Sequence, residues 1–160
     1  MKNRFVNIVA LFIFLLMFSA GSCNKGVVNP NVPIVSIDIV IDPNSTLFFE
    51  LNVAGGWTYL DGKPGVYIPP GSRGIIVYRM DMNTFIAYER TPPNEPNACC
   101  DSQTNVCTAL VVGDYYPFVV DTCNDNKYNI LDGSLFEGAG SFPLIRYRAD
   151  YDGATLHIYN

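Results

Sequence analysis

Short apolar runs and turn residues alternate along most of the chain. Runs rich in Val, Ile, Phe and Tyr are separated by Gly, Pro, Asn and Asp, as in proteins built from short strands. Outside the N-terminus, no long stretch carries a convincing helical period. The pattern predicts strands at residues 34–41, 46–53, 57–60, 65–68, 74–80, 85–89, 106–112, 116–120, 144–150 and 155–159.

These strands indicate one domain over residues 34–160. We expect an all-β fold, a small barrel or sandwich of about ten short antiparallel strands. The tight-turn signals Asp61-Gly62 and Asp152-Gly153 support antiparallel pairing. Residues 90–105 are polar and rich in Pro, which predicts a long loop of the kind that carries function.

The N-terminus has the pattern of an export signal. Lys2 and Arg4 precede an apolar run over residues 6–18, which is shorter than the roughly 20 residues of a membrane-spanning helix. Small residues follow, and Ala-Gly-Ser-Cys at 20–23 resembles a bacterial lipobox. The resemblance implies that residues 1–22 are a cleaved lipoprotein signal peptide and that Cys23 carries the lipid, palmitate included. Ordinary signal cleavage and an uncleaved anchor helix are the alternatives.

The expected mature protein is strongly acidic. Removal of the 22 residues before Cys23 leaves 138 residues and lowers the net charge from −5 to −7. This charge argues against a nucleic-acid partner, since phosphate binding needs clustered Lys and Arg. Residues 23–33 are expected to be a short tether that links the domain to a bacterial membrane, with the domain facing the periplasm or the cell exterior. The expected partners are that membrane and an unidentified envelope protein.

Three segments of the second half resemble a Rieske domain. GIIVYR at 74–79 and FIAYER at 85–90 match the strand pair that enters the first cluster loop. In KYNILDGSLFEGAGSFPLIRY at 127–147, Asp-Gly-Ser, a Gly-Ala-Gly turn and Pro-Leu before a Tyr-containing strand follow in the Rieske order. The resemblance covers residues 74–160 and implies a Rieske-like fold there.

The same resemblance implies that the iron–sulfur cluster is lost. A Rieske centre binds its two irons through two Cys and two His. The matching positions carry Thr91 and Pro93 in the first loop, and Asp121 and Asn124 in the second. The single His of the chain is His157, in the last predicted strand, where alternation predicts an outward side chain. We therefore expect no cofactor and no metal; a 2Fe-2S cluster with unusual ligands is the alternative.

Four Cys remain after Cys23, and an even number in an exported domain indicates two disulfides. They are Cys99, Cys100, Cys107 and Cys123. Some Rieske domains join their cluster loops by a disulfide, and the resemblance places Cys123 at that position. It implies a Cys100–Cys123 link between the loops and a small Cys99–Cys107 ring; the alternative exchanges Cys99 with Cys100. A four-Cys metal site and free reactive thiols are further alternatives.

The remaining polar and aromatic residues are expected to have structural roles. Residues 121–126 (DTCNDN) lack the spacing of a calcium loop and indicate a solvated turn. Asp101 and Asp114 are expected to be loop charges. Four aromatic residues are expected in the core rather than in an exposed patch: Tyr115, Tyr116, Phe118 and Phe136.

These observations favour a non-enzymatic protein. No Ser-His-Asp set and no phosphate-binding loop can be assembled from the sequence. We expect a membrane-anchored lipoprotein whose degenerate, cluster-free Rieske-like domain acts in binding or as a structural part of the cell envelope. The alternative is a redox protein: an iron–sulfur electron carrier with unusual ligands, or a thiol–disulfide sensor that uses the four Cys.

Overall fold

The computed structural model describes residues 29–160, so the predicted signal peptide, Cys23 and most of the tether lie outside the described residues. Nine strands and two short 3-10 helices (η) make up the described part. In chain order they are β1 (Asp38–Ile41), η1 (Thr46–Asn52), β2 (Trp57–Tyr59), β3 (Ile75–Arg79), β4 (Phe85–Glu89), η2 (Gly113–Tyr115), β5 (Phe118–Asp121), β6 (Asn126–Asn129), β7 (Leu135–Glu137), β8 (Arg146–Tyr151) and β9 (Leu156–Tyr159).

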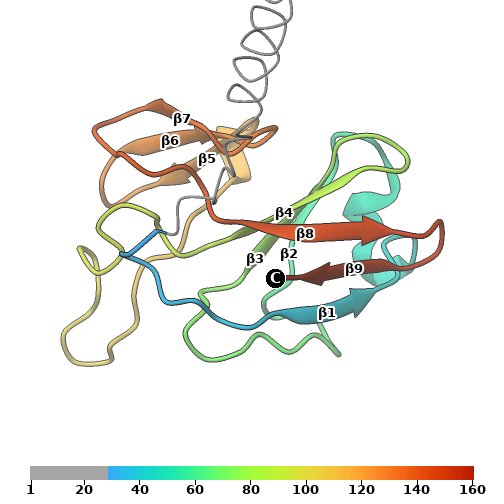
Figure 1. Ribbon diagram of the computed structural model, residues 1–160, viewed down its shortest axis with the longest axis horizontal. Helices are drawn as coiled ribbons and strands as arrows, with labels where there is room; N and C mark the ends of the chain where they lie inside the picture. The colour runs from blue at the N-terminus through green and yellow to red at the C-terminus, as the bar shows by residue number, and fades with distance from the viewer. Residues whose placement is uncertain (1–28) are drawn as a thin grey trace, which may run out of the picture.

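Six strands form one curled antiparallel sheet in the order β1-β9-β8-β4-β3-β2 (Figure 1). Every residue of β3 and β4 is buried, because this hairpin is covered on both faces. Ile75 and Val77 face a core shared with β1 and β9, whereas Ile76 and Tyr78 face a second core. The alternating side chains of one hairpin therefore contribute to two apolar clusters.

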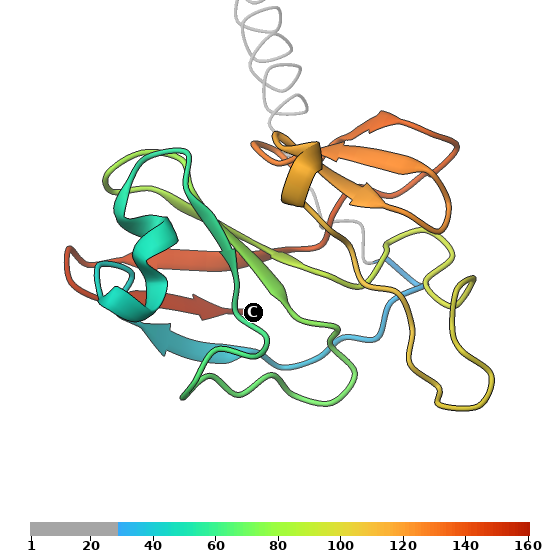
Figure 2. The ribbon, with the colours of Figure 1, turned by 180° about the vertical axis from the view of Figure 1, so that it is seen from behind.

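The other three strands form a small antiparallel sheet, β5-β6-β7, at one end of the molecule (Figures 1 and 2). Val119, Tyr128 and Ile130 from this region pack in the second core, together with Tyr88 of β4. The two sheets confirm the predicted all-β fold with antiparallel strands. They also place the long loop after β4 beside the small sheet.

The predicted strand at 46–53 is wrong, because this segment forms η1. Phe48 and Leu51 are buried, whereas Phe49 between them is 66% exposed. Buried positions three residues apart match the period of a 3-10 helix, and a strand would have buried alternate residues.

The predicted strands at 65–68 and 106–112 are also wrong. Val66 and Ile68 pack against the first core through their side chains, but their segment pairs with no strand. Residues 106–112 make only single antiparallel bridges, between Cys107 and Cys100 and between Val111 and Val120.

The sequence pattern missed β6 and β7. In β6 the inward positions are Asn126 and Tyr128, so a polar side chain occupies a core position. The Asn126 Oδ1 atom accepts hydrogen bonds from the backbone N–H groups of Ala139 and Gly140. A side-chain amide that accepts hydrogen bonds from a neighbouring loop thus stands where the alternating strand pattern would have an apolar residue.

Residues 29–33, which belong to the predicted tether, pack against the domain. Val32 is buried, and the Asn29 and Asn31 side chains both donate to the carbonyl of Pro93, at 2.8 and 3.4 Å. No helix within residues 29–160 is long and apolar enough to cross a membrane.

Candidate functional site

The loop after β4 and the loop after β5 meet beside the small sheet, and both contain positions that the Rieske resemblance matches to cluster ligands. In the first loop, Thr91 is buried and its hydroxyl donates to Glu89 Oε1 at 2.7 Å. The Pro93 carbonyl accepts the two hydrogen bonds from the tether. Both positions are therefore engaged with protein groups.

The two second-loop positions bind each other. Asp121 is fully buried, and its Oδ2 atom accepts a 2.7 Å hydrogen bond from the Asn124 side chain. Its Oδ1 atom accepts a bond from the backbone N–H of Cys123. Asn124 also donates to the carbonyl of Asn94 in the first loop, at 3.4 Å. Residues 122–125 form the predicted turn, and Thr122 and Asp125 are exposed. The flanking Asp121 and Asn126 are instead buried and bonded within the protein.

Asn94 joins the two loops to a third. Its side-chain nitrogen donates to the Tyr128 hydroxyl at 2.9 Å and to the Phe142 carbonyl at 3.0 Å. Its Oδ1 atom accepts from the backbone N–H groups of Ser141 and Phe142. All of the hydrogen-bonding capacity of this buried amide is used. A Cβ at Gly140 would lie 2.4 Å from the Asn94 nitrogen, so only glycine fits there.

A second polar centre lies under the first loop, around the buried carboxylate of Glu89. Its Oε1 atom accepts from the backbone N–H groups of Arg73 and Thr91 as well as the Thr91 hydroxyl. Its Oε2 atom accepts from the hydroxyls of Ser72 and Tyr147, both at 2.6 Å. Burial and the neighbouring Glu89 raise the pKa of Tyr147, so the phenol stays protonated and acts as a donor. These bonds fix the start of the loop to the six-stranded sheet.

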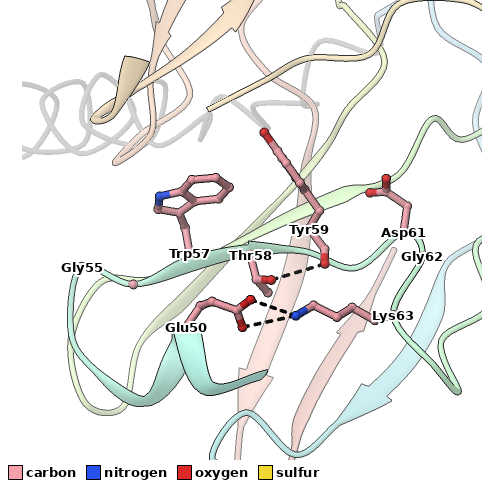
Figure 3. Close-up of a pocket in the computed structure, with 9 residues that line it drawn as sticks. Glu50, Gly55, Trp57, Thr58, Tyr59, Asp61, Gly62 and Lys63 are labelled. Carbon is pink, nitrogen blue, oxygen red and sulfur yellow. Dashed lines mark hydrogen bonds and ion pairs between the residues drawn. The ribbon is translucent and has the colours of Figure 1, made fainter. Parts of the chain in front are cut away.

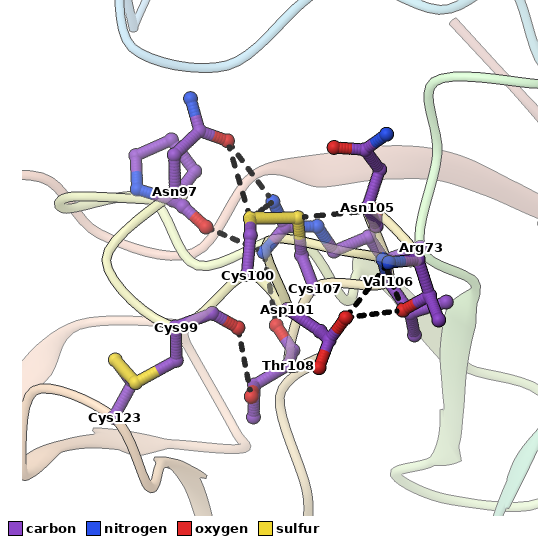
Figure 4. Close-up of a disulfide and its surroundings, with 12 residues drawn as sticks. Arg73, Asn97, Cys99, Cys100, Asp101, Asn105, Val106, Cys107, Thr108 and Cys123 are labelled. Carbon is purple, nitrogen blue, oxygen red and sulfur yellow. Dashed lines mark hydrogen bonds between the residues drawn. A yellow bond between two sulfur atoms is a disulfide. The ribbon is translucent and has the colours of Figure 1, made fainter.

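Two disulfides constrain the loops after β4 and β5 (Figure 4). Cys99 bonds to Cys123, 24 residues away, and Cys100 bonds to Cys107, seven residues away. The disulfide prediction is confirmed, but the favoured pairing is wrong and its alternative, with Cys99 and Cys100 exchanged, is present. The partner of Cys100 is decided by the hairpin at 101–106, which pairs Cys100 with Cys107 as opposite positions. Within residues 29–160, no group of three or more His, Cys, Asp or Glu side chains is arranged to hold a metal ion.

Arg73 connects the hairpin base to the sheet. One guanidinium nitrogen donates to the carbonyls of Pro96 and Thr108, at 2.6 and 2.9 Å. The other contacts Asn97 Oδ1 at 3.3 Å and Cys100 Sγ at 3.9 Å. Burial lowers the pKa of Arg73, and the carboxylates of Glu89 and Asp121 oppose that shift. Arg73, Asn94 and Glu89 hold the loops in place, yet the sequence analysis assigned a role to none of them.

A groove of about 640 Å³ runs along β2, at an edge of the large sheet (Figure 3). Trp57 and Tyr59 project from one face of the strand with their ring centres 5.2 Å apart, and the Glu50–Lys63 ion pair lies on the other side. Arg90 covers the Tyr59 ring at 3.8 Å and forms an ion pair with Asp61.

One edge of β2 pairs with no other strand in the described part of the chain. The bonds from Arg79 to the Gly56 carbonyl and from Leu60 to the Ile75 carbonyl fix which residues of this segment face β3. By antiparallel alternation, the N–H and C=O groups of Trp57 and Tyr59 point away from β3. The Tyr59 carbonyl there accepts a 3.4 Å hydrogen bond from the Thr58 hydroxyl. The groove therefore combines aromatic rings with a strand edge that pairs with no other strand within residues 29–160.

Two further predictions have different outcomes. His157 lies outward as predicted, on the solvent face of β9, with Nε2 2.7 Å from Asp38 Oδ1. The predicted core location of the aromatic residues is wrong for three of them: Tyr115, Tyr116 and Phe136 are 48%, 45% and 65% exposed. Phe118 is half-buried and packs on Phe136 with ring centres 4.7 Å apart. Tyr115 ends η2 and Tyr116 follows it, and Phe136 lies in β7, so none of these three rings stands at a core position.

Comparison with models of known protein families finds no match to this chain. Comparison with curated proteins finds no match either. The fold and the site geometry therefore carry the functional argument.

Proposed function

We propose that the chain is a membrane-anchored lipoprotein of the cell envelope whose degenerate, cluster-free Rieske-like domain acts by binding. The observation that carries the proposal is the state of the four positions matched to cluster ligands. Thr91, Asp121 and Asn124 use their side chains in hydrogen bonds within the protein. The Pro93 side chain has no atom that could bind a metal. A cluster would need Cys and His at these positions.

Metal analysis tests this directly. The full-length protein, purified from the membrane fraction without chelators, is expected to contain no stoichiometric iron and to show no visible absorption band of an iron–sulfur cluster. About two irons per chain with such a band would overturn the proposal and support the iron–sulfur carrier instead.

We place the binding surface on the groove along β2, and its occupant is an extended segment of an envelope protein. The N–H groups of Trp57 and Tyr59 and the Trp57 carbonyl point away from β3 and can pair with an added strand, which is how open sheet edges take up peptides. The two rings beside them supply apolar contact area. The groove is not suited to a charged ligand, because its charged side chains are already paired: Glu50 with Lys63, and Asp61 with Arg90.

Site-specific photo-crosslinking in intact cells tests the placement. A photoreactive residue at Trp57 is expected to give one discrete higher-mass adduct. The matched control is Val40, which is 61% exposed on β1 at the opposite edge of the sheet. Absence of an adduct at position 57, or the same adduct from both positions, would remove the groove from the proposal and leave the cluster-free domain to be judged by the iron measurement.

A further inference from the structure

The two disulfides have different charged neighbours. Cys100 Sγ is 3.9 Å from the guanidinium of Arg73, whereas the backbone of Cys123 is bonded to the carboxylate of Asp121. A nearby cation stabilises a thiolate and a nearby carboxylate destabilises it. When a thiolate opens each disulfide, Cys100 is therefore a better leaving group than Cys123.

Cys107 offers the route of attack. Together with Arg73, Asn97 and Asn105, it lines a polar cavity of about 360 Å³ beside the hairpin base. The hairpin itself, residues 101–106, is exposed along its whole length and projects from both sheets (Figures 1 and 2). A thiolate that enters this cavity reaches Cys107, with Cys100 as the partner to be displaced.

The hairpin does not depend on its disulfide for its shape. The backbone N–H of Asp101 donates to the Val106 carbonyl at 2.8 Å, and Thr108 donates to the Cys99 carbonyl at 3.0 Å. The Asp101 carboxylate caps the tip by accepting bonds from Gln103 and Thr104. After reduction these bonds still hold Cys100 and Cys107 opposite each other, so the disulfide can form again without a search for its partner.

We propose that Cys100–Cys107 is a functional, reversibly reducible disulfide that exchanges with an exported dithiol. The thiolate of the dithiol attacks Cys107 Sγ; the Cys107–Cys100 bond breaks, and Cys100 leaves as a thiolate beside Arg73. The second thiol of the dithiol, deprotonated, attacks the first sulfur of the dithiol; the bond of that sulfur to Cys107 breaks, and Cys107 leaves as a thiolate and takes up a proton. The dithiol is oxidised to its disulfide, and the protein gains two electrons in two thiols. Cys99–Cys123 keeps the two loops joined throughout.

Reduction in dithiothreitol redox buffers, followed by alkylation and peptide mass spectrometry, tests the proposal on the full chain. Cys100–Cys107 is expected to be reduced at a less reducing poise than Cys99–Cys123. Arg73→Gln is expected to slow its reduction about threefold to tenfold, because the leaving thiol loses its cation. Arg73→Lys, which keeps the charge, is expected to restore most of the rate.

Arg148→Gln is the matched control, because Arg148 lies on β8 over the Tyr159 ring and away from both disulfides. A second measurement separates electrostatics from loss of structure: in the reduced protein, the pH midpoint for alkylation of Cys100 is expected to lie below that of Cys123. The proposal fails if both disulfides are reduced at the same redox potential. It also fails if Cys100–Cys107 is reduced in Arg73→Gln at the wild-type rate, as is expected for the control Arg148→Gln.

Discussion

The Tyr147 phenol donates a 2.6 Å hydrogen bond to Glu89 Oε2 in the interior of the protein. Tyr88, next to Glu89 on β4, is equally buried, yet its hydroxyl has no hydrogen-bond partner within residues 29–160. The two tyrosines form a matched pair that differs in one bond.

We predict that Tyr147→Phe lowers the free energy of unfolding by about 1.5–3 kcal/mol, because a bond to a buried carboxylate is lost. Tyr88→Phe is expected to be neutral, or to stabilise by up to about 1 kcal/mol, because it removes a buried hydroxyl without a partner. Urea unfolding of both variants, followed by Trp57 fluorescence, measures the difference. Equal losses would show that the hydroxyl of Tyr88 is satisfied in solution.

Stability is expected to fall at alkaline pH. Burial raises the pKa of Tyr88 from 10.0 to about 12, and it raises the pKa of Tyr147 too. Between these pH values the unfolded chain loses protons that the folded chain keeps, so the contribution is complete below pH 10 and is lost as the pH rises toward 12. Urea midpoints measured across this range should decline for the wild type and decline less for Tyr88→Phe. A flat profile would contradict the buried, protonated state of both phenols.

Asn94→Ala is predicted to lower the free energy of unfolding by about 2–4 kcal/mol, because it leaves the backbone N–H groups of Ser141 and Phe142 without their acceptor. Asn83→Ala in the exposed β3–β4 turn is the matched control, expected within about 0.5 kcal/mol of wild type. Chemical denaturation of both variants gives the comparison. An effect of Asn94→Ala as small as that of the control would mean that the three loops do not depend on this amide.

The two disulfides are predicted to stabilise the fold unequally. Their sequence separations of 24 and 7 correspond to about 3–4 and about 2–3 kcal/mol of loop entropy in the unfolded chain. The double variant Cys99→Ala/Cys123→Ala should therefore have a lower urea midpoint of unfolding than the double variant Cys100→Ala/Cys107→Ala. The reverse order would mean that the hairpin ring, rather than the link between loops, holds the domain together.

Cys23→Ser is predicted to move the protein from the membrane fraction to the soluble fraction, since the proposed lipid attachment requires that sulfur. Cell fractionation with Ser19→Ala as the control measures the shift, and mass spectrometry of the purified wild type should find an acylated N-terminal peptide beginning at residue 23. Retention of Cys23→Ser in the membrane would favour the uncleaved anchor.

The sheet at the centre of the fold could be predicted because its residues follow simple rules. In β3 and β4, runs of β-branched and aromatic residues end at an Asp-containing turn, and both strands lie within the predicted ranges. In β6 the buried Asn126 breaks the pattern, because its value to the fold lies in bonds to a distant loop. The alternating pattern of apolar and polar residues identifies only strands that bury apolar side chains. A strand whose inward position is a hydrogen-bonded amide is therefore not predicted by it.

The candidate site shows the same limit. The resemblance named Thr91, Pro93, Asp121 and Asn124 by position, but it could not show that Asn94 and Glu89 organise the bonds around them. Asn94 makes its bonds to residues 34 to 48 positions away, and no local pattern marks such a residue. The favoured disulfide pairing was wrong for a related reason, because adjacent Cys99 and Cys100 differ only in where the hairpin points them.

The attachment of Asn29 and Asn31 to the Pro93 carbonyl also has a mechanical consequence. A pull on the N-terminal end of the described chain is resisted first by these two side-chain bonds and by buried Val32, before any force reaches the hydrogen bonds between β1 and β9. Pro93 belongs to the loop that Cys99 joins to Cys123. Force applied at residue 29 is thus delivered to the disulfide-linked loops before it reaches the sheet.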